Sequence, residues 1–274
     1  MGLFSNNHDR PGKGVDKNGP QKRRIWEFFE IVWNQASKLI LANILYSLAM
    51  LPLVIGIVLT FKIDWNSASI IVLKIPGQID LLGAILLVVS IFTSFPATLG
   101  FCFILRNIQR REHAWIWSDF IKHTKRNYKS GVVNGFITIF VYMLLFFAFG
   151  AYRSGLIISG GIGQYMSLLI LVGIILFTWM QYYISVMIVT FELKLSSVYR
   201  NALIFAIGKL PLNIFITAVC IVIIYLLLLF PIPFITFFLS FFLWYALFGS
   251  IIMFSVYPTI DRYMLQKAEK KYEE

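Results

Sequence analysis

The sequence has few charged residues, and acidic residues are the scarcer half of them. Asp, Glu, Lys and Arg make up 14% of its 274 residues, against roughly 25% in soluble domains. Hydrophobic residues account for 59%, and they gather in runs close to the roughly 20 residues that span a bilayer. This composition excludes a large soluble domain and predicts a multi-pass membrane protein.

Cysteine and histidine, the residues that metal and redox sites need, are also rare. Cys102 and Cys220 both lie inside apolar runs and match no metal or redox spacing. His8, His113 and His123 have no Cys, His or carboxylate partner at ligand spacing on a shared helix face. We therefore expect no metal site and no cofactor.

The cores of the apolar runs contain no Asp, Glu, Lys, Arg or His. Catalysis needs converging reactive groups, and proton-coupled pumps place ionisable groups inside the membrane. We therefore expect no catalytic residues and no enzyme. The polar residues in the runs are mild, and helix-to-helix hydrogen bonding is the simplest role for them. The candidates for a further role are the amides, which are costly in lipid unless paired: Asn43, Asn134 and Gln181.

The apolar runs predict an all-α bundle of about six transmembrane helices. They cover residues 39–61, 81–105, 132–152, 166–191, 212–230 and 234–256. With six spans, 21 Lys and Arg fall on one side of the membrane and 3 on the other. The positive-inside rule then places both termini in the cytoplasm. The same bias accounts for the net charge of +11, so we expect no nucleic-acid partner.

This topology divides the chain into four parts. Residues 1–24 are polar and turn-rich and form a flexible cytoplasmic tail. Residues 25–38 carry Trp and Phe on one helical face and polar residues opposite, which is typical of an interfacial amphipathic helix. The alternative is a plain extension of the first span. Residues 39–260 form the six-span membrane domain, and residues 261–274 form a charged cytoplasmic tail.

The stretch 94–131 changes from an apolar run to a cationic segment rich in aromatics, with seven Lys or Arg and two acidic residues. It predicts an exit from the membrane, a helix lying on the cytoplasmic surface and a return. The expected apolar stripe of that helix is Trp117, Phe120, Ile121, Thr124 and Tyr128. The pattern favours binding to anionic lipid, and a docking platform for a cytosolic partner is the alternative. The candidate residues are Arg110, Arg111, Trp115, Trp117, Lys122, Lys125, Arg126 and Lys129.

A second amphipathic segment follows the fourth span. At an offset of 79 residues, Asn134 aligns with Asn213 and residues 136–138 align with residues 215–217. These matches suggest a parallel tandem repeat of span, surface helix and span. Chance similarity between apolar sequences is the alternative.

Five segments carry a resemblance to a known family: FPATLGFCFILRN (95–107), REHAWIWSDF (111–120), KRNYKSG (125–131), NILYSLAMLP (43–52) and the start MGLFSNNHDRPGKGVDK (1–17). In these segments the chain resembles the YesL-like family of bacterial multi-pass membrane proteins. It departs at Ser94, where the family often has Gly. The resemblance implies a protein of the bacterial cytoplasmic membrane, of unknown function, whose genes tend to stand beside carbohydrate importers of the ATP-binding-cassette (ABC) type.

Taken together, these features favour a non-enzymatic accessory or scaffold protein associated with ABC-type carbohydrate uptake. The expected partners are anionic lipids and subunits of the sugar importer. The alternative is a small uncoupled solute transporter or pore built on the repeat. No feature of the sequence specifies an oligomeric state.

Overall fold

The computed structural model describes residues 23–61, 80–155, 157–158, 160–228 and 240–265. Within these ranges every regular element is helical and no strand forms. The α-helices are α1 (Arg24–Asn34), α2 (Ala36–Phe61), α3 (Leu81–Gln109), α4 (Ile116–Arg126), α5 (Tyr128–Arg153), α6 (Gly161–Thr190), α7 (Leu195–Gly208), α8 (Leu210–Leu228) and α10 (Tyr245–Ile260). Two π-helical segments, η2 (Ser240–Trp244) and η3 (Asp261–Leu265), flank α10.

Five of these segments are long and apolar enough to cross a membrane: α2, α3, α5, α6 and the segment Phe241–Met264. The pair α7 and α8, with an 85° bend between its two helices, makes a sixth if it crosses as one broken span. The prediction of an all-α, multi-span membrane protein is therefore confirmed. The predicted ends were close, although α2 begins at Ala36 and α6 at Gly161, a few residues earlier than expected. The predicted tails lie almost wholly outside the described residues.

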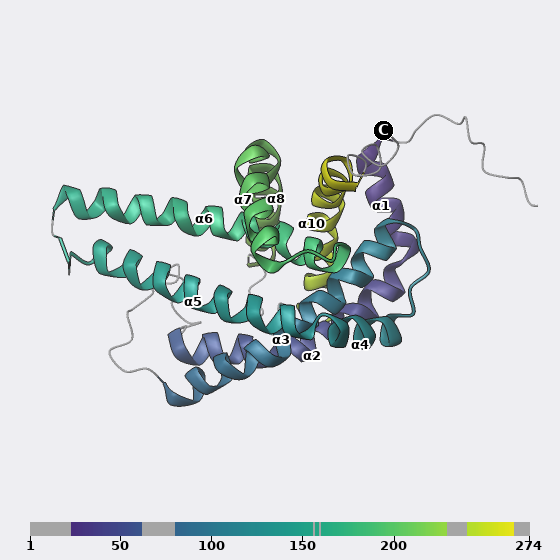
Figure 1. Cartoon of the computed structure of the whole chain (residues 1–274), viewed down its shortest axis with the longest axis horizontal. Coiled ribbons are helices and arrows are strands. Elements are labelled where there is room, and N and C mark those ends of the chain that lie inside the picture. The colour runs from purple at the N-terminus through teal and green to yellow at the C-terminus, as the bar shows by residue number, and fades with distance from the viewer. Residues whose placement is uncertain (1–22, 62–79, 156, 159, 229–239, 266–274) are drawn as a thin grey trace, which may run out of the picture.

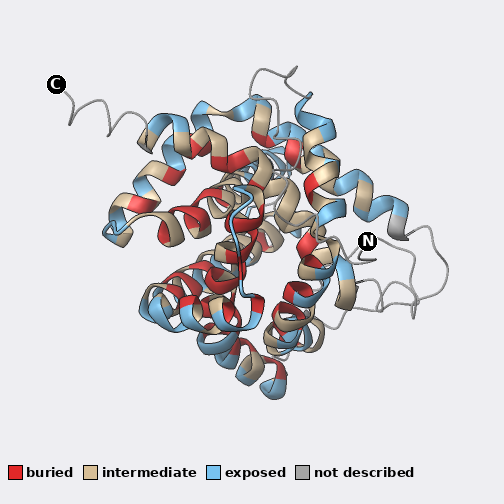
Figure 2. Ribbon diagram, turned by 90° about the vertical axis from the view of Figure 1, so that its right-hand side faces the viewer, coloured by how far each residue is buried: buried red, intermediate tan, exposed pale blue. Residues whose placement is uncertain are grey.

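Helix α3 is the centre of the bundle, because it packs against α2, α4, α5, α6 and α10. In Figure 1, α2 lies along α3, and α5 lies beside α6 with its C-terminal part extending away from the rest. The buried residues face these neighbouring helices and the exposed ones face outward (Figure 2). Many outward residues are large and apolar, such as Leu168, Leu169 and Val172 on α6. Such a surface suits contact with lipid rather than water.

Glycines allow α5 and α3 to approach at backbone distance. A Cβ atom on Gly131 would lie 2.7 Å from Cα of Pro96, and one on Gly135 would lie 2.6 Å from Cγ of Phe95. The two glycines are four residues apart, so they lie on the same face of α5. This is the small-xxx-small arrangement that lets membrane helices pack closely.

A third glycine brings α4 against α3. A Cβ atom on Gly100 would lie 2.6 Å from the carbonyl oxygen of Phe120. The short helix α4 therefore packs directly on α3 through Ile116, Phe120 and His123, which are all buried.

Candidate functional site

The first candidate site is the basic surface, which we define by the predicted residues Arg110, Arg111, Trp115, Trp117, Lys122, Lys125, Arg126 and Lys129. All of them lie on α4 or on the chain just before and after it. Helix α3 ends in a reversal in which the N–H of Arg111 donates to the carbonyl of Ile108 and that of Glu112 donates to the carbonyl of Asn107. This Schellman pattern puts Arg111 in the left-handed region, at φ 57°. Helix α4 then starts with Asp119 accepting a hydrogen bond from the N–H of Trp115 at 2.8 Å.

The predicted apolar stripe of α4 is wrong in part. Trp117 is 63% exposed and Tyr128 is 44% exposed, whereas Ile116 and His123 take the buried face with Phe120. The close approach permitted by Gly100 fixes this rotation of α4. The consequence is that Trp115 and Trp117 both lie on the surface.

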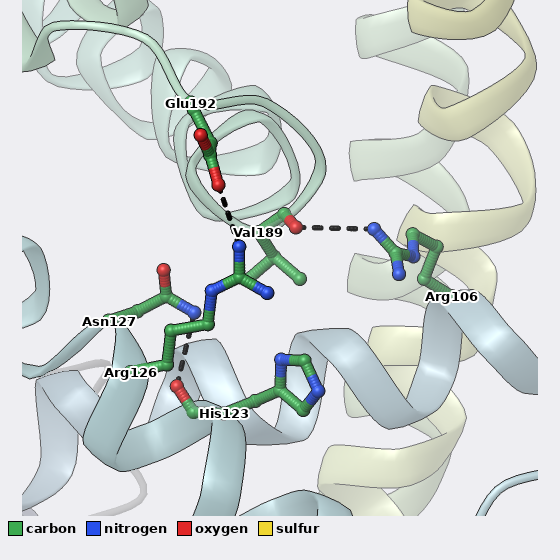
Figure 3. A network of polar contacts seen from close by, with 6 residues as sticks. All are labelled: Arg106, His123, Arg126, Asn127, Val189 and Glu192. Atoms are coloured by element: carbon green, nitrogen blue, oxygen red, sulfur yellow. Dashed lines mark hydrogen bonds and ion pairs between the residues drawn. The ribbon is translucent and has the colours of Figure 1, made fainter.

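Arginines near the C-terminus of α3 and on α4 form polar contacts with neighbouring helices, and Figure 3 shows those of Arg106 and Arg126. Arg106, on the last turns of α3, donates from Nη1 to the carbonyl of Val189 at the C-terminus of α6, at 3.2 Å. A cation at that helix end also complements the helix dipole. Arg126 of α4 pairs with Glu192 just after α6 at 2.7 Å, and Arg111 pairs with Glu27 of α1 at 3.4 Å.

The lysines of the basic surface behave differently. Lys122, Lys125 and Lys129 are all exposed. Their ammonium groups form no ion pair within the part of the chain that the structure describes. These three cations and the two exposed tryptophans are therefore the part of the surface that is available for a partner.

His123 is the buried titratable group beneath this surface. Its ring stacks on Phe103 of α3 with 3.3 Å between centroids. Burial lowers its pKa below the ordinary value, and the nearby cations Arg126, Arg106 and Lys122 act in the same direction, against the opposing effect of Asp119.

The second candidate site is an intramembrane cavity of about 930 Å³ between α2, α3, α5, α6 and α10. Its lining is mostly apolar, and it is partly open to the outside. One wall is aromatic, because Tyr46 stacks on Phe101 at 4.3 Å and meets Tyr245 edge-on at 5.2 Å. The phenol of Tyr46 is hydrogen-bonded to Thr98 at 2.9 Å.

The three amides predicted from the sequence separate in the structure. Asn134 and Gln181 line the cavity from α5 and α6, whereas Asn43 does not. Asn43 is fully buried and connects α2 to the C-terminal span: Nδ2 donates to the carbonyl of Phe241 at 2.7 Å, and Oδ1 accepts from the N–H of Ala246 at 2.6 Å. Its role is to satisfy backbone groups around the wide π-helical turn η2.

Another part of the cavity wall carries the polar side chains of Asn134, Thr138 and Gln181. Together with Tyr199 of α7, which lies beside them, these residues form what we call the polar corner. The hydroxyl of Tyr199, on α7, donates to Oδ1 of Asn134 at 2.6 Å. Thr138 and Gln181 lie beside the same hydroxyl. Sequence analysis did not single out Thr138 or Tyr199. Thr138 could have been found, because it lies one helical turn after Asn134 and shares its face.

The geometry of both sites suits binding. No Asp, Glu, Lys, Arg or His lines the cavity among the described residues. Within the same ranges, no group of three or more His, Cys, Asp or Glu side chains comes together as a metal site would require.

Comparison with known proteins adds a family. Residues 39–149 match the family described as protein of unknown function, DUF624. In this multi-span membrane protein, the region similar to the family covers most of α2, all of α3 and α4, and most of α5. Neither a curated protein nor a solved structure matches the chain.

Proposed function

We propose that this chain is a non-enzymatic accessory protein that holds a partner at the cytoplasmic face of a bacterial membrane through its basic surface. The observation that carries the proposal is a set of exposed cations, Lys122, Lys125 and Lys129, that have no ion pair with any described residue and lie beside the exposed Trp115 and Trp117. Each cation near an anionic membrane surface contributes about 1 kcal/mol. Tryptophan prefers the same headgroup region.

Helix α1 adds a second amphipathic element to this arrangement. Trp26, Phe29 and Trp33 are exposed on it. On its other side, Phe28 packs on Phe254 of α10 at 5.3 Å between ring centroids. A helix with one aromatic face on the protein and another facing outward suits the membrane interface. In this proposal lipid at α1 orients the protein, and the lysines of α4 lie at the same membrane surface, where they contact anionic headgroups and the partner.

The proposed partner is a subunit of an ABC-type sugar importer. Its support is the family resemblance seen in the sequence, together with a cavity lining that contains no Asp, Glu, Lys, Arg or His among the described residues. The test is purification of the full chain from its native membranes in mild detergent. Importer subunits should come with the wild-type chain and be lost from a variant in which Lys122, Lys125 and Lys129 are all changed to Glu.

The matched control is Arg153→Glu, which reverses an exposed cation at the far end of α5. It should retain the importer subunits. A lone protein in all three preparations, with sugar uptake unchanged when the gene is deleted, would contradict the proposal.

The cavity favours one second candidate, a small uncoupled carrier. Its apolar lining offers few hydrogen bonds to a sugar, so a carried solute would have to be largely apolar. Flux of an apolar solute in proteoliposomes that falls with Gln181→Leu would support this candidate. Flux equal to that of empty vesicles would reject it.

A further inference from the structure

We propose that the intramembrane cavity is a binding site for a neutral amphipathic lipid, with a long hydrocarbon chain and an ester or hydroxyl oxygen at its head. In this assignment the head lies at the polar corner and the chain lies against the aromatic wall. The inference does not rest on the accessory function proposed above, because it concerns different residues.

The polar corner contains hydrogen-bonding groups that the protein leaves unused. Thr138 is only 7% exposed. Its Oγ1 and the Nε2 of Gln181 are both buried beside the hydroxyl of Tyr199, which donates to Asn134 instead. Neither atom forms a hydrogen bond of good geometry in the described parts of the chain. Buried polar groups without a partner are rare and costly. Two of them side by side on a cavity wall indicate that something else completes their hydrogen bonds.

Other hydroxyls around the cavity already have hydrogen-bond partners within the protein. Tyr46 is bonded to Thr98, and Tyr142 is bonded to Thr178 at 2.9 Å. Because the hydroxyls of Tyr46 and Tyr142 are already hydrogen-bonded, these residues contribute mainly the apolar surface of their rings to the cavity. The two buried groups without a well-formed hydrogen bond, on Thr138 and Gln181, lie at one place, which a ligand with a single polar end would match.

The chemistry of the unused groups defines that end. The amide nitrogen of Gln181 only donates, and the hydroxyl of Thr138 both donates and accepts. The complementary group is an oxygen acceptor such as an ester carbonyl or an alcohol. Since no acidic or basic side chain lines the cavity among the described residues, a charged head would be buried without a counter-ion. A neutral head avoids that cost.

The size of the cavity fits the rest of the molecule. Its volume of about 930 Å³ lies in the upper part of the range of ligand pockets, roughly 300–1,000 Å³. The apolar lining and the partial opening allow a hydrocarbon chain to enter from the surrounding bilayer. A sugar would fill the same space with hydroxyls that find no partner there.

The test uses the full chain in liposomes with a monoacylglycerol whose chain carries a diazirine and an alkyne. After illumination, we expect label on peptides of α3, α5 and α6 that line the cavity. Gln181→Leu and Thr138→Val should each lower this labelling roughly two- to tenfold, the loss expected for one hydrogen bond. The two substitutions keep the approximate size of the side chain. Each removes a different hydrogen-bonding group, so the two labelling results test the proposal independently.

Two matched controls isolate the polar corner. Gln164→Leu makes the same change at an exposed position of α6, and Thr93→Val makes it at an exposed position of α3. Both should label as the wild type does. A diazirine alkane without a polar head should label all variants alike, and excess fatty alcohol should compete better than an ionised fatty acid.

Three results would overturn the proposal. Unchanged monoacylglycerol labelling in both Gln181→Leu and Thr138→Val would show that the corner does not hold the head. Equal labelling of the cavity peptides by the headless alkane and the monoacylglycerol would show bulk bilayer lipid only. Cross-links that join two copies of the chain across the cavity would assign it to a dimer interface.

Discussion

Two of the buried asparagines form hydrogen bonds with backbone groups at irregular parts of the helices, and a third lines the cavity. Asn43 supplies hydrogen bonds around the π-helical turn η2. Asn213 likewise satisfies a backbone group at the bend between α7 and α8, because its Nδ2 donates to the carbonyl of Ala206 at 3.0 Å. Its Oδ1 accepts a hydrogen bond from Tyr183 at 2.8 Å. Asn134, its counterpart at an offset of 79 residues, faces the cavity instead. A shared residue type therefore does not imply a shared role, and the tandem repeat stays a prediction.

His123 makes stability depend on pH. Burial holds its folded-state pKa below the ordinary value, so between the two values the unfolded chain binds more protons than the folded one. The stabilisation is present above about pH 6.5, the ordinary histidine value, and is lost as the pH falls through the lowered folded-state pKa. Thermal unfolding in detergent should therefore show a larger loss of stability between pH 7.5 and 5.5 for the wild type than for His123→Phe.

His113→Phe is the control for this prediction, because His113 lies exposed on the loop before α4. It should keep the pH dependence of the wild type. An identical loss of stability in His123→Phe and the wild type would contradict the assignment. The four charged groups that face His123, namely Asp119, Arg126, Arg106 and Lys122, stay unchanged in both variants.

At the scale of helices, Gly131 controls the packing of α5 on α3. A Cβ at this position would lie 2.7 Å from Cα of Pro96, which cannot move without its backbone. We expect Gly131→Ala to destabilise the protein by about 1–3 kcal/mol, as overpacking does. Gly173→Ala is the matched control, because its Cβ would lie 3.8 Å from the nearest atom, Cδ2 of Leu145.

The two alanine variants should differ in their effect on stability, because only Gly131→Ala should destabilise the protein. In an open position, Ala is better than Gly in a helix by about 0.5–1 kcal/mol, so Gly173→Ala should be neutral or stabilising. Unfolding temperatures measured in the same detergent compare them directly. Equal effects of the two substitutions would show that the α3–α5 contact does not need a glycine.

The spans were predictable because an apolar run of the right length has few alternatives in a membrane. The start of α8 was also visible, because the predicted fifth span begins at residue 212 and α8 begins at Leu210. The rotation of α4 was not, because it depends on Gly100, which is distant in sequence. The cavity was not predictable either. Its walls bring together Tyr46, Asn134, Gln181 and Tyr245 from four helices, and their spacing in sequence carries no periodic signal.

For the whole molecule, the distribution of basic residues predicts orientation. Most cations lie on the side of the basic surface, whereas Arg153 lies at the opposite end of α5. The positive-inside rule therefore places Arg153 outside the cell. Single cysteines at Arg153, Asn34 and Arg262, all exposed, can report this once Cys102 and Cys220 are changed to Ala.

A membrane-impermeant maleimide should label Arg153→Cys in intact cells and should label Asn34→Cys and Arg262→Cys only after lysis.

The comparison of Asn34 with Arg262 also decides the number of spans. If the bent pair α7 and α8 crosses the membrane, the two positions lie on the same side, because the spans between them are then even in number. If the pair stays on one surface, five spans remain and Arg262→Cys should react in intact cells while Asn34→Cys does not. Labelling of Asn34→Cys but not Arg153→Cys in intact cells would reverse the orientation and remove the basis for a cytoplasmic partner at α4.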